Sequence, residues 1–194
     1  ENLRWRQVRA VVSHNPKLLA GIAATSFMFL GGETVLGVWL PKFEVDVFGA
    51  SATWASLALT FYWVGQLLGR VVGIPLTRKR FPSSILVFSA VWMVVFVLVL
   101  AFSPNQAASL ALTFGAGLGV CVCYSVIGSY ASKFPHWHSG VVYSLFQFSG
   151  GVGAMVFPYL TGPVAAAWGF RAALAMAAVP AVIVVGLAFY LRRV

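Results

Sequence analysis

Apolar residues form six long runs along the chain, separated by short connections. The runs cover Leu18 to Leu40, Ser51 to Ile74, Ser83 to Phe102, Ala107 to Ala131, Gly140 to Thr161 and Arg171 to Leu191. Each run has about the 20 residues that a helix needs to cross the hydrocarbon of a bilayer. The connections contain proline, glycine, asparagine and serine, which favour turns. The pattern predicts six transmembrane helices.

The composition agrees with a chain that has lipid as its solvent. Hydrophobic residues make up 60% of the 194 residues and charged residues only 9%, whereas soluble domains carry roughly 25% charged residues. The mean hydropathy is +0.90. Cys121 and Cys123 point to different faces of a helix, so they indicate neither a disulfide nor a metal site. We expect an all-α membrane protein without a cofactor.

The basic residues predict the orientation in the membrane. Eleven of the 13 lysines and arginines fall in the N-terminal stretch, the second and fourth connections with their helix ends, and the tail; Lys42 and Arg171 fall on the other side. By the positive-inside rule, both termini are cytoplasmic. This distribution explains the net charge of +9 without a nucleic-acid partner. We expect an integral protein of the bacterial inner (plasma) membrane, surrounded by lipid.

The chain opens without methionine, on "ENLRWRQVRA". This stretch lacks the apolar core and cleavage site of a signal peptide. We expect residues 1–17 to be a cytoplasmic linker in a longer protein, and residues 18–194 to be a six-helix transmembrane bundle.

The six runs divide into two similar halves, 18–102 and 107–191, offset by about 88 residues. This shift places Val64-Gly65 on Val152-Gly153, Leu30-Gly31 on Leu118-Gly119, and Pro75 on Pro163. Because each half has an odd number of crossings, the second half enters the membrane from the opposite side. Inverted three-plus-three repeats are typical of secondary transporters.

Two segments carry a resemblance to a known family. "GRVVGIPLTRKR", from Gly69 to Arg80, resembles the cytoplasmic loop signature of the major facilitator superfamily, with Gly73 and Arg78 matching and Thr77 in place of its aspartate. "SGVVYSLFQFSGGVGAMVFPYLTGPVAAAWGFRAAL", from Ser139, resembles the eleventh helix of that family. The chain thus resembles the C-terminal half of a twelve-helix transporter, nearest to the sugar-permease-like branches.

The resemblance implies a particular arrangement of the helices. The first and fourth would line a central cavity, the second and fifth would flank it, and the third and sixth would face lipid. Five residues, Arg70, Gly73, Arg78, Lys79 and Arg80, would form a cytoplasmic gate loop, or else serve only as a topology signal. A partner bundle, either an N-terminal six-helix half or a second copy, would complete the transporter.

Glu33 is the one acid within the predicted crossings. A charge in the membrane is costly unless it is paired, solvated or protonated, so Glu33 is a candidate for proton coupling or substrate binding. The alternatives are a structural carboxylate and a side chain that reaches the outer interface. Arg70 is expected at a different depth, which makes it a poor partner.

Three glycines, Gly31, Gly32 and Gly37, flank Glu33. Glycines weaken a helix and allow it to bend, which predicts a hinge at a binding site. Small residues also allow close helix packing, and the sequence favours neither interpretation.

Polar aromatic and amide side chains recur at helical spacing. Tyr62 and Gln66 share one face of the second helix, Tyr143 and Gln147 share one face of the fifth, and Tyr124 lies on the fourth. Such groups suit a small hydroxylated substrate through stacking and hydrogen bonds. Hydrogen bonding between helices is the alternative.

The sequence therefore predicts a secondary active transporter that moves a small polar solute by alternating access, with possible proton coupling through Glu33. The alternative is a membrane receptor or scaffold of the same fold that transports nothing. A membrane enzyme or a haem protein is disfavoured, because all three histidines (His14, His136 and His138) fall outside the crossings. We expect no catalytic residues.

Overall fold

The computed structural model describes residues 9, 11–79, 81–135 and 139–193; the side chains of 74–79 and 121 lie outside that description. The described chain is helical apart from short connections. Its elements are α2 (Pro16–Phe48), α3 (Ala52–Lys79), α4 (Pro82–Ala101), α5 (Gln106–Ser129), the short 3-10 helix η1 (Tyr130–Lys133), α6 (Ser139–Ala175) and α7 (Ala178–Arg193).

These elements follow the six apolar runs. Within the described residues, five helices are long and apolar enough to cross a membrane. The sixth crossing is divided between two elements. It starts after Gly169, where a φ of 82° interrupts α6, turns at 176–177, and continues as α7. Pro180 accounts for the turn, because it has no N–H for the carbonyl of Met176.

The first two crossings are longer than predicted. The connection expected after Leu40 is helical as far as Phe48, with Pro41 inside the helix. Pro41 removes only the hydrogen bond to the carbonyl of Gly37, so the helix continues. It ends at Gly49, whose φ of 64° forms a left-handed cap. The second crossing likewise continues past Ile74 to Lys79.

Polar caps fix where two helices begin. The Asn15 side chain accepts a hydrogen bond of 3.1 Å from the backbone N–H of Leu18 at the start of α2. Asn105 does the same for Ala108 at the start of α5, over 2.9 Å. These are the first helices of the two predicted repeats, and both use the asparagine cap that satisfies a free N–H.

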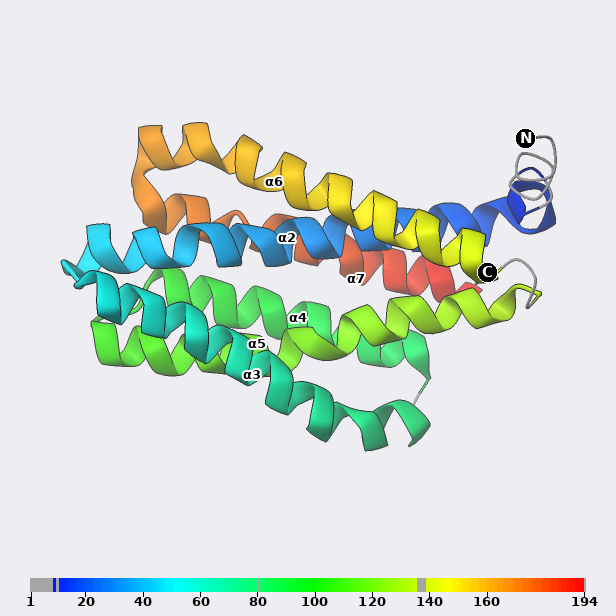
Figure 1. The fold of residues 1–194 in the computed structure, drawn as a ribbon, viewed down its shortest axis with the longest axis horizontal. Helices are drawn as coiled ribbons and strands as arrows, with labels where there is room; N and C mark the ends of the chain where they lie inside the picture. Colours follow the sequence, from blue (N-terminus) through cyan, green and yellow to red (C-terminus); the bar gives the residue numbers. More distant parts are fainter. Residues whose placement is uncertain (1–8, 10, 80, 136–138, 194) are drawn as a thin grey trace.

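The helices are arranged in two layers (Figure 1). The most extensive contacts join α2 to α6 and α3 to α5. The α4 and α7 helices pack against each other and lie behind α5 and α2 in the view. Helix α2 begins and α7 ends at the same end of the bundle. The third and sixth crossings thus occupy the rear, and the other four form the front face; that the third and sixth face lipid stays a prediction.

Two glycine contacts are related by the predicted repeat. A Cβ at Gly65 would overlap the backbone oxygen of Phe114, and a Cβ at Gly153 would overlap that of Phe27. The two glycines are 88 residues apart and the two phenylalanines 87 apart. The contacts therefore support the predicted shift for the second and fifth crossings. For the first and fourth crossings, the contacts favour a shift of 87 residues. That shift aligns Gly119 with Gly32 rather than with Gly31.

Candidate functional site

The centre of the site is a hydrogen bond between two residues that the sequence singled out separately. Nε2 of Gln66 on α3 donates to Oε1 of Glu33 on α2 over 2.7 Å. The Gln66 side chain is buried, with 2% exposed, and Glu33 is half-buried. A donor fixed by burial holds the carboxylate in one orientation. Glu33 is therefore placed between two crossings rather than at the outer interface.

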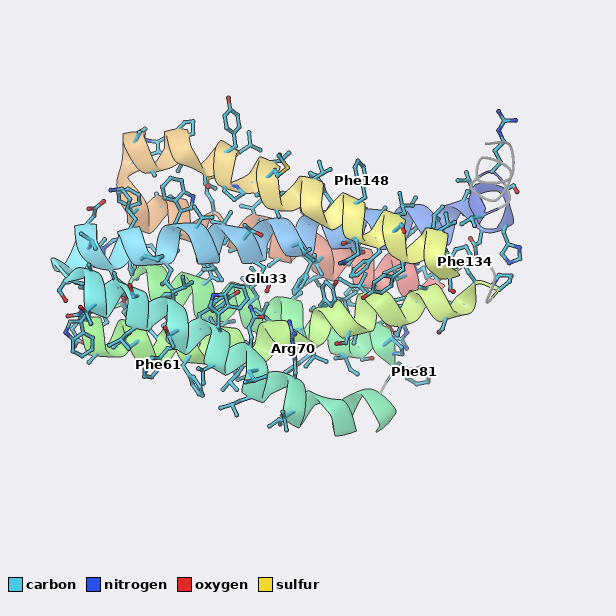
Figure 2. All side chains as sticks on the ribbon, viewed as in Figure 1. Glu33, Phe61, Arg70, Phe81, Phe134 and Phe148 are labelled. Carbon is cyan, nitrogen blue, oxygen red and sulfur yellow. The ribbon has the colours of Figure 1, made fainter. Side chains whose placement is uncertain are left out.

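Arg70 lies one helical turn after Gln66 on α3. It lies closer in depth to Glu33 than the sequence predicted, although no ion pair within 4.0 Å joins the two side chains in the described structure. Its guanidinium is close enough to interact electrostatically with the Glu33 carboxylate. Figure 2 shows both side chains near the middle of the bundle. The difference in depth arises because α3 continues to Lys79, which places Arg70 deeper than an end at Ile74 would. Opposite charges at similar depth offset part of the cost of burying each.

A second polar group lies between α5 and α6. The hydroxyl of Tyr124 donates a hydrogen bond to Oε1 of Gln147, and it also interacts with Tyr143. Both tyrosine rings pack against the buried ring of Phe146, at centroid distances of 5.0 and 5.4 Å. Tyr124 also lies within electrostatic range of Arg70, so the two polar groups are near each other.

The two tyrosine–glutamine pairs, predicted on equivalent faces, differ in environment. Tyr62 and Gln66 are buried, whereas Tyr143 and Gln147 are exposed. The ring of Tyr62 packs edge-on to Trp63 at 5.5 Å. The structure therefore brings together Glu33, Gln66, Arg70, Tyr124, Tyr143 and Gln147, and leaves Tyr62 in the packed core beside them.

Two of the three glycines near Glu33 lie at close helix contacts. A Cβ at Gly31 would overlap the ring of Phe157 on α6, and one at Gly32 would come within 2.9 Å of Pro180 on α7. Gly37 has open space around it, and its carbonyl is the one that Pro41 leaves unpaired. Helix α2 is continuous through all three. Close packing thus accounts for two of them, and a hinge remains a prediction, best placed at Gly37.

The predicted gate residues do not form one loop. Arg70 and Gly73 lie within α3, and a Cβ at Gly73 would overlap Val122 of α5. Arg78 and Lys79 end the same helix, with side chains that are not described, and Arg80 lies outside the described residues.

A second carboxylate escaped the sequence reasoning. Glu44 is fully buried within α2, and its Oε1 accepts a hydrogen bond from Ser109 of α5. Glu33 is therefore not the one acid within a crossing. The sequence predicts a connection after Leu40, where Pro41 stands, but α2 continues through it to Phe48. The available signal was spacing, because Glu44 follows Glu33 by 11 residues, about three helical turns.

Comparison with known proteins places the fold. The sequence model of the Major Facilitator Superfamily matches residues 21–194. The chain belongs to this superfamily. It is 20% identical to the E. coli fucose:proton symporter FucP, with a TM-score of 0.81 over 90% of this chain and 42% of that one. A peptide transporter, POT, gives a TM-score of 0.80 at 16% identity, over 90% of this chain and 38% of that one. The bundle thus has the fold of one half of a superfamily transporter.

Two curated relatives are named as sugar transporters. The glucose/mannose transporter GlcP of Bacillus subtilis is 25% identical over 137 residues, which cover 71% of this chain and 34% of GlcP. A putative glucose/galactose transporter of Helicobacter pylori J99 is 28% identical over 88 residues, 45% of this chain and 22% of that protein. The match therefore spans about a third or less of the length of these two relatives.

Proposed function

We propose that this chain forms the C-terminal half of a secondary transporter that moves a hexose-like solute by alternating access. The observation that carries the proposal is the bond from Gln66 to Glu33, with Arg70 beside it. Carboxylate, amide and guanidinium groups held at one depth suit the hydroxyls of a sugar. The named sugar transporters among the relatives support the same substrate class.

Glu33 is the group proposed to couple transport to protons. It is half-buried on α2 and held by a neutral donor, with a cation nearby. In this scheme, proton uptake on Glu33 weakens its attraction to Arg70 and changes the contacts offered to the sugar. In the same scheme, the group of Tyr124, Tyr143 and Gln147 on α5 and α6 offers the sugar an aromatic face and an amide.

The second half of the transporter is proposed to cover the front face. Large apolar side chains are exposed on α3 and α6, such as Leu67 and Met155 at 62% and 76%, and they need lipid or protein as a neighbour. We assign the termini to the cytoplasmic side of a plasma membrane, the inner membrane in bacteria, from the charge distribution. Arg78 and Lys79, at the end of α3, then belong to the proposed cytoplasmic gate.

The test uses the full-length protein in proteoliposomes with an inward proton gradient. Uptake of radiolabelled glucose, mannose, galactose and fucose is measured for the wild type, Glu33→Gln and Glu44→Gln. We expect accumulation of at least one hexose, loss of gradient-driven accumulation in Glu33→Gln with sugar exchange retained, and little change in Glu44→Gln. Hexose binding without any transport would favour a receptor. Unchanged accumulation and pH dependence in Glu33→Gln would make that carboxylate structural.

The two-half arrangement has a separate test. The 194-residue chain alone should bind sugar weakly and transport nothing, because alternating access needs two bundles that move against each other. Its mass in detergent and its uptake are compared with those of the complete protein. Strong transport by the lone monomer would refute this part of the proposal.

A further inference from the structure

Trp63 of α3 is a half-exposed aromatic side chain beside the Glu33 group, with 51% exposed. It precedes Gln66 by three residues and Arg70 by seven, and these spacings place all three on one face of a helix. Gln66 bonds to Glu33, and Arg70 lies within electrostatic range of the same carboxylate. Trp63 therefore borders the polar group, about one turn nearer the start of α3.

The depth of Trp63 differs from that of most exposed tryptophans in membrane proteins, which gather at the two membrane interfaces. Trp63 follows the start of α3 at Ala52 by 11 residues, about 16 Å of helix, and α3 continues well past it to Lys79. Trp54, which is 47% exposed, lies in the first turn of the same helix, where an interfacial tryptophan belongs. Trp63 thus lies deep in the membrane, at the level of the polar group.

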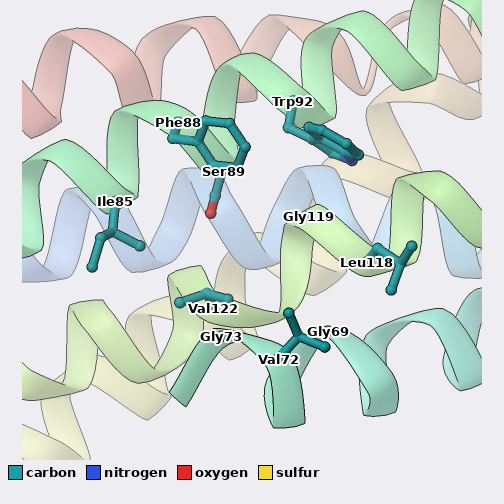
Figure 3. Close-up of a pocket in the computed structure, with 10 residues that line it drawn as sticks. All are labelled: Gly69, Val72, Gly73, Ile85, Phe88, Ser89, Trp92, Leu118, Gly119 and Val122. Carbon is teal, nitrogen blue, oxygen red and sulfur yellow. The ribbon is translucent and has the colours of Figure 1, made fainter. Parts of the chain in front are cut away.

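The other side of α3 has a different character (Figure 3). There α3 and α4 border an apolar crevice of about 320 Å³, whose lining includes Val72 and Phe88, one hydroxyl from Ser89 and no charge. Val72 follows Trp63 by nine residues, which is about two and a half helical turns, so the two side chains point to opposite sides of α3. The groups that suit a hydroxylated ligand thus lie on the Trp63 side and not at the crevice.

The indole of Trp63 is supported from inside the bundle. The ring of Tyr62 packs edge-on to it, with centroids 5.5 Å apart, and the Tyr62 side chain is buried. A ring that is already ordered loses little further freedom when a ligand binds to it. Trp63 is therefore a fixed apolar surface with the Glu33–Gln66 bond at its edge.

We propose that Trp63 is the surface on which the ring of the sugar stacks, and that it selects a pyranose over an open-chain polyol. This role rests on the proposed hexose transport and adds the group that recognises the ring itself. The C–H groups on one face of a pyranose carry partial positive charge, which suits the negative face of an indole. The hydroxyls at the rim of that ring are then directed to Glu33, Gln66 and Arg70. Those polar groups alone would accept the hydroxyls of any polyol, whereas a flat apolar surface requires a ring.

Competition binding on the full-length protein tests this role. Glucose, mannose and galactose are each compared with their own alditol as competitors of the radiolabelled hexose. We expect Trp63→Leu to weaken hexose binding by about 2- to 10-fold and alditol binding much less, and Trp63→Phe, which keeps an aromatic face, to stay close to the wild type. Trp54→Leu is the matched control, because Trp54 is similarly exposed on the opposite side of the same helix; it should change neither affinity.

Hydroxyl-radical footprinting of the wild type needs no variant, so it decides the question even where a substitution prevents folding. The radicals form in water, and they oxidise side chains in an aqueous cavity but spare those covered by detergent or protein. We expect oxidation of Trp63, mapped by peptide mass spectrometry, and its protection by saturating hexose. The alditol at equal concentration should not protect it, which controls for radical scavenging.

The outcomes separate this role from the proposed function. Equal hexose affinity in folded Trp63→Leu and Trp54→Leu, or a Trp63 that is not oxidised in the absence of sugar, would overturn the role of Trp63 and leave hexose transport standing. The second result would mean that lipid or the other half of the transporter covers the indole. A wild type that binds none of the hexoses would refute both.

Discussion

Gln66 and Glu33 belong to two successive crossings and meet through a hydrogen bond of 2.7 Å. The Gln66 amide is buried, so water cannot replace it easily as a donor. Replacing Gln66 by an apolar residue leaves Oε1 of Glu33 without this donor. An unsatisfied buried polar group costs about 1–3 kcal/mol of folding free energy, and a charged group costs more. The bond thus links the stability of the bundle to the geometry of the proposed substrate site.

Gln66→Leu should therefore lower both the stability and the sugar affinity of the protein. The loss of one hydrogen bond predicts a weaker affinity by about 2- to 10-fold, measured by equilibrium binding, with a lower thermal midpoint in detergent. Gln106→Leu is the matched control, because Nε2 of Gln106 is buried without a hydrogen bond in the described structure; its removal should leave stability unchanged or raise it. Equal effects of the two variants would argue against a specific role for Gln66.

Arg70 should show energetic coupling to Glu33. A double-mutant cycle of Glu33→Gln and Arg70→Gln, measured by sugar binding at fixed pH, is expected to be non-additive by about 0.5–3 kcal/mol. The physical reason is that the neutral glutamine at either position already removes most of the electrostatic interaction between them. Strictly additive effects would mean that the two residues act independently, and that Arg70 serves the cytoplasmic gate instead.

The sequence predicts the fold more completely than it predicts the site. The six crossings followed from apolar length, which the membrane imposes directly. The pairing of Glu33 with Gln66 did not follow, because it depends on how far α2 and α3 are offset along their axes. Helix ends were the source of error. Pro41 and Pro75 resemble breakers in a sequence, but a proline removes one hydrogen bond and a long helix can continue past it.

Gly153 should tolerate no side chain. A Cβ there would overlap the backbone oxygen of Phe27, so Gly153→Ala must separate α6 from α2. Overpacking of this kind costs about 1–3 kcal/mol, which should lower the thermal midpoint in detergent. Gly151→Ala on the same helix is the control, since no atom lies within 4 Å of its Cβ. A midpoint for Gly153→Ala as high as that of Gly151→Ala would show that the two helices are less closely packed than described.

The Glu44–Ser109 contact should be purely structural. Glu44 is buried within α2, and Oε2 of its carboxylate has no hydrogen-bond partner in the described structure. Ser109→Ala removes the donor to Oε1 and should destabilise the bundle by about 1–3 kcal/mol. Ser144→Ala is the control, because that exposed hydroxyl bonds only to its own helix, at Gly140.

Replacing both partners separates the cost of an orphaned carboxylate from the value of the contact. In the double variant Glu44→Leu/Ser109→Ala the buried acid disappears together with its donor, and replacement of a buried polar pair by apolar groups is often neutral or stabilising. We therefore expect the double variant to unfold at a higher temperature than Ser109→Ala, with sugar uptake close to that of the wild type. A double variant less stable than Ser109→Ala, or one that folds normally but has lost uptake, would give Glu44 a role in transport that its burial does not predict.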